Sequence, residues 1–123
     1  MKNHSPRFLA LVAEVKTRIQ EISAADAAQR QAAGAVLIDV RDAEEFAQDH
    51  AAGAIGMSKG TVEMNIEKAV PDTSTEIICY CGGGYRSALV VDNLQRMGYS
   101  NVRSQAGGIR AWREQGLPIT SDH

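Results

Sequence analysis

Residues 76–90 read EIICYCGGGYRSALV, the most informative stretch of the chain. It opens with a short apolar run, 76–81, which is typical of a buried β-strand. Three glycines follow, and the apolar spacing after them predicts a helix from Arg86 to Met97, ended by Gly98. The pattern therefore places Cys81 at the carboxyl end of a strand and at the amino end of a helix.

A thiol in this position faces backbone N–H groups of the loop and of the first helical turn. Such a concavity favours anions and hence the thiolate, which is the nucleophilic form of cysteine. Many cysteines are simply small core residues, but three glycines and an arginine after Cys81 do not form a core element. We therefore predict that Cys81 is catalytic and that Gly82, Gly83 and Gly84 let the backbone approach a sulfur-bearing or anionic substrate.

The rest of the chain alternates between strand and helix patterns. Strands are expected at 19–22, 35–40, 54–57, 76–81 and 101–104. Helices are expected at 6–19, 23–34, 61–69, 86–97 and 109–115, with one more beginning at Asp42. This alternation predicts an α/β fold with a five-stranded, mainly parallel sheet and helices on both faces. Residues 1–18 are expected to be an N-terminal helical extension and residues 19–123 the folded domain.

Composition sets limits on function. The 123 residues suit one domain, and a net charge of −2 gives no electrostatic basis for binding nucleic acid. No apolar stretch approaches the ~20 residues of a membrane helix, and Glu14 interrupts the only N-terminal apolar run, so we expect neither a membrane span nor a signal peptide. Two cysteines this close together form no disulfide framework, which favours a reducing, cytoplasmic compartment.

Charged residues follow the second apolar run, 35–40. Carboxyl ends of parallel strands meet at one edge of a sheet, so Asp39 and Arg41 should lie near Cys81. We expect Asp39 to support the strand end by accepting backbone N–H groups, and Arg41 either to contact the ligand or to brace the loop. Arg86 opposes the macrodipole of the helix that it begins, so it needs a partner and is expected to brace the loop or bind an anion.

Other side chains near the loop leave alternatives open. Tyr85 either lines the pocket mouth or shields the loop, and Ser87 either caps the helix or donates to the sulfur. Cys79 shares a strand face with Cys81 and is either a core thiol or a resolving thiol. The scattered His4, His50 and His123 lack the usual spacing of zinc ligands, so no metal or other cofactor is expected.

The sequence resembles rhodanese-like domains in three segments that occur in the family's order. These are Asp39-Val40-Arg41 with Glu45-Phe46, His50 and Gly53-Ala54-Ile55, then Cys81-x-x-Gly84-x-Arg86-Ser87, then Gly107-Gly108 with Ala111-Trp112 and Gly116-x-Pro118. The resemblance spans about residues 19–118. It implies a five-stranded parallel sheet and a sulfurtransferase that carries a sulfane sulfur from thiosulfate or a persulfide on Cys81 to cyanide, a thiol or a protein acceptor. It also suggests Glu45 as the partner of Arg86. The chain departs from the family pattern at Asp49-His50-Ala51, where Gly-His-Ile is usual.

Three other functions compete with a single-domain sulfurtransferase. Cell-cycle dual-specificity phosphatases share the fold family and a cysteine-to-arginine loop, but their loop is one residue longer than the six residues from Cys81 to Arg86 here. Non-catalytic modules of this family often lack the cysteine, which this chain keeps. A persulfide carrier that serves another enzyme would use the same Cys81. The loop length favours sulfur over phosphate.

Overall fold

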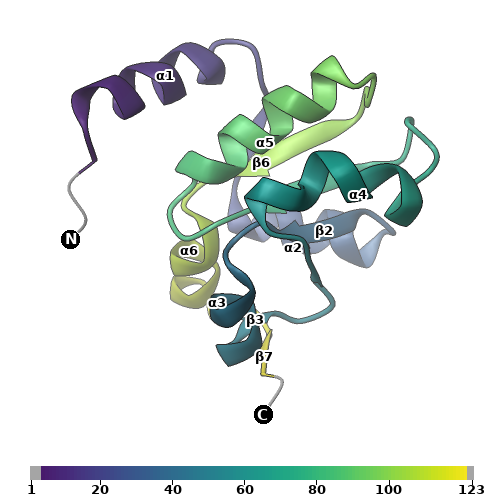
Figure 1. Cartoon of the computed structure of the whole chain (residues 1–123). Coiled ribbons are helices and arrows are strands. Elements are labelled where there is room, and N and C mark those ends of the chain that lie inside the picture. Colours follow the sequence, from purple (N-terminus) through teal and green to yellow (C-terminus); the bar gives the residue numbers. More distant parts are fainter. Residues whose placement is uncertain (1–3, 122–123) are drawn as a thin grey trace.

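The computed structural model describes residues 4–121 (Figure 1). Two short segments lie outside the described residues. They are residues 1–3, which begin the expected extension, and residues 122–123, which end the expected domain and include His123. The strands are β1 Glu21–Ile22, β2 Val36–Asp39, β3 His50–Ala51, β4 Ile55–Gly56, β5 Ile77–Tyr80, β6 Val102–Gln105 and β7 Ile119–Thr120. The helices are α1 Pro6–Lys16, α2 Ala24–Ala32, α3 Ala43–Gln48, the 3₁₀ turn η1 Lys59–Thr61, α4 Val62–Ala69, α5 Tyr85–Arg96 and α6 Gly108–Glu114.

The main sheet has five strands in the order β1-β6-β5-β2-β4, and every neighbouring pair is parallel. The α/β prediction and its strand number are therefore confirmed. β5 lies in the middle, with Cys79 paired to Ile38 of β2 and to Ser104 of β6. Because all five strands run the same way, their carboxyl ends share one edge of the sheet, and Cys81 lies at the centre of that edge.

Helices cover both faces of the sheet. On one face α4 and α5 pack against alternate strand residues, including Ile77, Cys79 and Cys81. On the other face α2 and α6 pack against the intervening residues Ile78 and Tyr80. Figure 1 shows α4 and α5 in front of the sheet and α2 behind it. The strands are buried on both sides, which explains why their sequences are continuous apolar runs.

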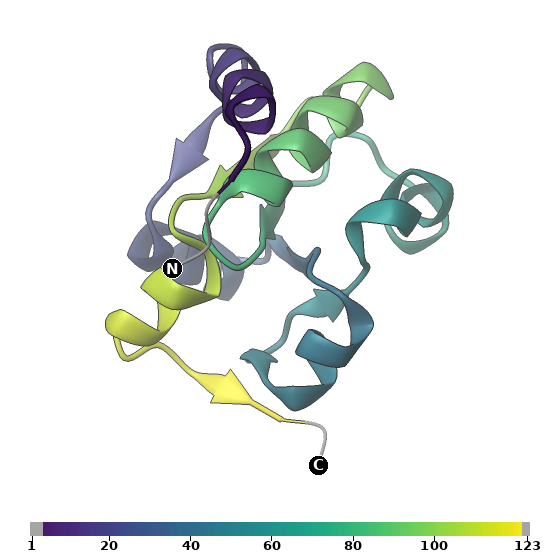
Figure 2. The same cartoon turned by 60° about the vertical axis from the view of Figure 1, so that its left-hand side comes forward.

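The N-terminal helix α1 forms a further layer. It begins after Ser5, whose hydroxyl accepts the N–H of Phe8, and it ends at Lys16 rather than at the expected residue 19. Its buried Val12 and Val15 pack with Ala88 of α5, and Figure 2 shows α1, in dark purple, beside α5. This packing places α1 on the outer side of α5, away from the sheet.

A small second sheet did not follow from the sequence. β3 pairs antiparallel with β7, with His50 opposite Thr120. Each strand has only two residues, too few to show an alternating pattern. This pairing ties the end of the described chain to the loop after α3.

Candidate active site

Cys81 directly follows β5, and only 1% of the residue is exposed. Its Sγ accepts the backbone N–H of Gly84 at 3.1 Å and that of Ser87 at 3.4 Å. Gly84 has φ +100°, a left-handed conformation that glycine adopts without strain, and it precedes the first residue of α5. Two oriented N–H dipoles at a helix start stabilise negative charge on the sulfur.

A buried pair of hydroxyls continues this polar contact. Ser87 Oγ lies 3.5 Å from Cys81 Sγ and 2.8 Å from Ser104 Oγ, and both serines are fully buried. Gly84, not Ser87, occupies the N-cap of α5, so Ser87 contacts the sulfur instead of capping the helix. Ser104 was missed in the sequence. The only available signal was its place near the end of β6, the strand beside β5.

The loop carbonyls are held by the start of α6. The Ile109 N–H donates to the Cys81 carbonyl at 2.8 Å, and the Arg110 N–H donates to the Gly82 carbonyl at 3.4 Å. A Cβ on Gly108 would lie 2.2 Å from the Cys81 carbonyl oxygen. Only glycine allows this approach, which gives Gly107-Gly108 a physical reason that the sequence alone did not supply.

Arg86 and Glu45 lie together at the outer side of the loop. Arg86 Nη1 is 3.5 Å from Glu45 Oε1, and the arginine side chain passes close to Gly82. Glu45 Oε1 also accepts the Asp42 N–H in the capping box that starts α3. Both side chains are partly exposed, so the energy of this pair is at most about 1 kcal/mol. The contact nevertheless joins α3 to the cysteine loop.

Asp39 and Arg41 form a buried pair at the end of β2. Arg41 donates to both carboxylate oxygens of Asp39 and to the Asp49 carbonyl, and its own N–H also donates to Asp39. Burial disfavours the charge of Arg41, but the hydrogen bonds and attraction to Asp39 outweigh it, so the pKa of Arg41 is raised. Tyr80 adds a 2.6 Å hydrogen bond to Asp39, and burial raises the pKa of Tyr80. These are the contacts of bracing residues, and a role of Arg41 toward a ligand stays a prediction.

Cys79 lies in the interior of β5, with no exposed surface. Burial, followed by the nearby Cys81, raises the pKa of Cys79 to about 12. Both cysteines are free thiols in the same core cluster. Cys79 is therefore held as a neutral thiol at physiological pH.

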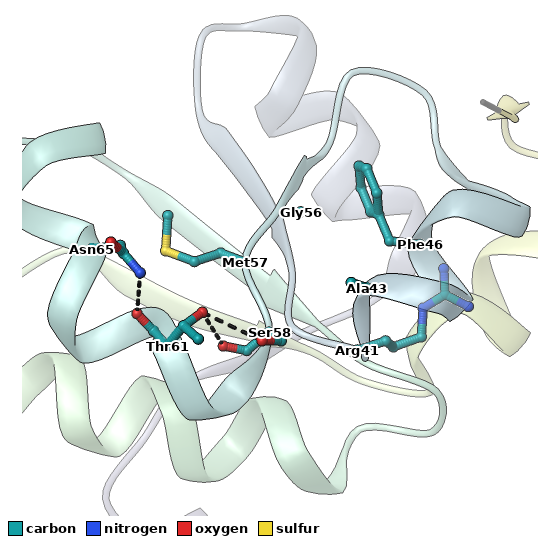
Figure 3. A pocket seen from close by; sticks show the side chains of 8 residues that line it. All are labelled: Arg41, Ala43, Phe46, Gly56, Met57, Ser58, Thr61 and Asn65. Atoms are coloured by element: carbon teal, nitrogen blue, oxygen red, sulfur yellow. Dashed lines mark hydrogen bonds between the residues drawn. The ribbon is translucent and has the colours of Figure 1, made fainter.

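A cavity of about 330 Å³ lies at the same edge of the sheet, beyond β2 and β4 (Figure 3). Arg41, Phe46, Met57 and Ser58 are among its lining residues, together with Ala43, Gly56, Thr61 and Asn65. Cys81 does not line it. Within residues 4–121, no three His, Cys, Asp or Glu side chains are grouped so that they could hold a metal ion.

Comparison with known proteins agrees with this geometry. The sequence profile of the rhodanese-like domain matches residues 23–115. The thiosulfate sulfurtransferase GlpE of Pseudomonas entomophila is 35% identical over 97 residues, which cover 79% of this chain and 87% of that protein.

Two solved structures cover nearly all of the chain. A Rhodopseudomonas palustris protein of unknown function, described as a possible tyrosine phosphatase, has a TM-score of 0.83 and 29% identity, and the match covers 98% of this chain and 99% of the other. The polysulfide-sulfur transferase of Wolinella succinogenes, described as a homodimer, has a TM-score of 0.79 and 28% identity, and the match covers 94% and 88%. The profile match and the identity to the Pseudomonas enzyme show that this chain belongs to the rhodanese-like domain family.

Proposed function

We propose that this rhodanese-type sulfurtransferase carries a sulfane sulfur as a persulfide on Cys81. The donor is thiosulfate or a persulfide, and the acceptor is a thiol or cyanide. One observation carries the proposal: Cys81 Sγ lies at a helix start and accepts two backbone N–H groups. These donors favour the Cys81 thiolate, both as the nucleophile that begins the reaction and as the leaving group when the sulfur is passed on.

The reaction proceeds in two balanced steps. The Cys81 thiolate attacks the outer sulfur of thiosulfate, a new S–S bond forms, and sulfite leaves with the electron pair of the broken bond. Cyanide or a thiolate then attacks the outer sulfur of the persulfide. Thiocyanate or a new persulfide forms, and the Cys81 thiolate returns with its electron pair. No external oxidant or reductant is needed.

Each residue of the loop has a separate role in these two steps. Gly84 and Ser87 direct their N–H groups at Cys81 Sγ, which carries the negative charge before the donor is attacked and after the acceptor takes the sulfur. Gly82 and Gly83 carry no side chains that would block a second sulfur atom, which extends from Cys81 as the persulfide forms. Arg86, paired with Glu45 at 3.5 Å, shapes the loop and supplies positive charge toward an anionic donor.

The names of the relatives support both kinds of sulfur donor and do not favour one over the other. The Pseudomonas protein is named for thiosulfate and the Wolinella protein for polysulfide. Thiosulfate and polysulfide both present a sulfur atom that a thiolate can attack. An acceptor protein with an exposed thiol would use the same chemistry.

Phosphatase activity is the second candidate because one structural neighbour is described as a possible tyrosine phosphatase. The six residues from Cys81 to Arg86 favour sulfur. A phosphoryl group on Cys81 would need room and donors for three oxygens, whereas the two N–H groups observed at Sγ suit a single sulfur atom.

Intact-mass measurement tests the proposal. Incubation with thiosulfate should add one sulfur atom to the peptide that contains Cys81, and cyanide should remove it. The same preparation should barely hydrolyse aryl phosphates, with Cys81→Ser protein as the background. Cysteine-dependent phosphate release that exceeds sulfur transfer would reverse the assignment.

We also propose a reducing, cytoplasmic location and a division into an extension, residues 1–18, and a sulfurtransferase domain, residues 19–123. Two free thiols suit a reducing compartment. None of the helices within residues 4–121 is both long and apolar enough to cross a membrane. The family match starts at residue 23, after α1 has ended, which supports treating α1 as an addition.

A further inference from the structure

The cysteine loop has no side chains of its own that could order its three glycines. Gly82, Gly83 and Gly84 have no side chains, and consecutive glycines have more backbone freedom than any other residues. The positions of the Gly84 and Ser87 N–H groups at the sulfur must therefore be fixed by contacts at the edges of the loop. The start of α6 fixes the Cys81 side, through the Ile109 N–H.

On the other side of the loop, Tyr85 lies in sequence between the two donors and packs against α1. Its ring centroid is 4.6 Å from that of His4 and 6.2 Å from that of Phe8, and the His4 and Phe8 rings are 5.2 Å apart. Lys16 Nζ lies 5.4 Å from the Tyr85 centroid. Aromatic rings at these distances attract one another beyond the effect of the area that they bury. We refer to His4, Phe8 and Tyr85 as the aromatic cluster.

The helix that supplies this cluster is itself fixed. Just beyond α1, Arg18 donates to both carboxylate oxygens of Asp92 on α5, at 2.8 and 3.0 Å. Gln95 of α5 donates to the Arg18 carbonyl at 3.2 Å. Val12 and Val15 are buried against α5 between Arg18 and the aromatic cluster. Because α1 is held in this way, its Phe8 side chain can restrict the position of the Tyr85 ring.

From these contacts we infer that α1 is a brace for the sulfur-binding loop and that Phe8 is a positioning residue that acts through Tyr85. Packing of Phe8 on the ring limits the motion of the Tyr85 backbone and so keeps the N–H groups of Gly84 and Ser87 directed at Cys81 Sγ. The effect of Phe8 on catalysis rests on the proposed function, because it presupposes sulfur transfer at Cys81. The structural part of the inference, the order of the loop, stands without any substrate.

Phe8→Ala is the central variant, and Leu11→Ala is its matched control. Leu11 is on the same helix and is 48% exposed, outside the aromatic cluster. We expect Phe8→Ala to lower kcat for sulfur transfer about fivefold with KM within about twofold, because the donors act on charge that develops during transfer. Hydrogen exchange of the Gly84 and Ser87 amides should become about tenfold faster. Phe8→Trp should restore both quantities, and Leu11→Ala should change neither.

A second pair of variants separates positioning from loss of stability. In a Tyr85→Leu background, Phe8→Ala should have no further effect on kcat, because Phe8 acts through the Tyr85 ring. Val12→Ala should weaken the contact between α1 and α5 while keeping the aromatic cluster. The inference is overturned if Phe8→Ala has its full effect without Tyr85, or if Val12→Ala at equal loss of stability lowers kcat equally.

Hydrogen exchange distinguishes this inference from the proposed function. It is measured on the free protein, so an unchanged loop in Phe8→Ala overturns the brace even where sulfur transfer is active. Absence of sulfur transfer in the unaltered protein, with faster loop exchange in Phe8→Ala, instead overturns the function and leaves the brace in place.

Discussion

The interior of β5 and the point just past its end surround the same side chain with different groups. Cys79 and Cys81 are two residues apart, share one face of the strand and are 0% and 1% exposed. The surroundings of Cys79 are apolar, and burial raises its pKa to about 12. Cys81 instead receives N–H groups from Gly84 and Ser87 and lies beside the Ser87 hydroxyl.

Exposure therefore does not distinguish the two cysteines. Both thiols are buried, and what separates them is the end of the strand. Inside a sheet, backbone N–H groups are used by neighbouring strands, but past its end the chain turns and can direct them at a side chain. The predictions below test whether this difference in donors is sufficient.

The largest effect is expected when each sulfur is replaced in turn. Cys81→Ser should lower sulfur transfer by at least about 1000-fold, since the nucleophile is lost. Cys79→Ser should keep activity within about twofold per folded molecule. Steady-state assays with thiosulfate and cyanide measure both. A comparable collapse in Cys79→Ser would make Cys79 a catalytic partner and end the contrast between the two sites.

Insertion of one glycine after Gly83 changes the loop without changing either cysteine. It should lower sulfur transfer about 100-fold, because a displacement of about 1 Å in the Gly84 donor is enough for a loss of that size. The same variant should be assayed with aryl phosphates, which a longer loop can admit. Unaltered sulfur transfer would show that loop size does not set the chemistry.

Removal of the hydroxyls should have a smaller effect than disruption of the backbone donors. Ser87→Ala keeps its N–H at 3.4 Å from the sulfur but loses the hydroxyl at 3.5 Å, so we expect about a tenfold loss of kcat. Ser104→Ala removes only the hydroxyl behind Ser87 and should cost about threefold. Rates of cysteine alkylation, measured beside kcat, report whether the sulfur itself is affected. A larger loss in Ser104→Ala than in Ser87→Ala would contradict this order.

The ion pair at the outer side of the loop should contribute about as much as the Ser104 hydroxyl. Arg86→Ala and Glu45→Ala should each reduce kcat/KM about threefold, and the double variant should be no worse than the stronger single one. The coupling expected for a partly exposed pair is about 0.5 kcal/mol. Glu44→Ala on the same helix is the matched control. Strictly additive losses would show that Arg86 and Glu45 act separately.

The last prediction concerns stability at high pH and not activity. The folded protein keeps the Cys79 proton because burial raises its pKa from 9.0 to about 12, whereas the unfolded chain releases it near 9.0. The stability that this retained proton provides is therefore complete below about pH 9 and declines as pH rises toward 12, by up to about 1.4 kcal/mol per pH unit. Cys79→Ala should flatten this decline in urea unfolding experiments. Tyr80, whose pKa burial also raises, contributes to the remaining slope. An unchanged slope in Cys79→Ala would contradict the buried neutral thiol.

The sequence determined the features that depend on neighbouring residues. The apolar run before Cys81, the three glycines after it and the helical pattern from Arg86 were sufficient to predict the strand, loop and helix that hold the thiol. The alternation of elements predicted the parallel sheet. These patterns are local because backbone conformation and burial of one face depend on residues a few positions apart.

The contacts that complete the site depend on how distant segments of the chain pack together. Ser104 reaches Ser87 from the neighbouring strand, Gly108 makes room for the Cys81 carbonyl, and Tyr85 meets Phe8 across α1 and α5. The two-residue strands β3 and β7 likewise pair although they are far apart in the sequence. His50, for example, pairs with Thr120, which lies 70 residues later. Such contacts leave no periodic signal, because each depends on where a distant segment packs rather than on the residues beside it.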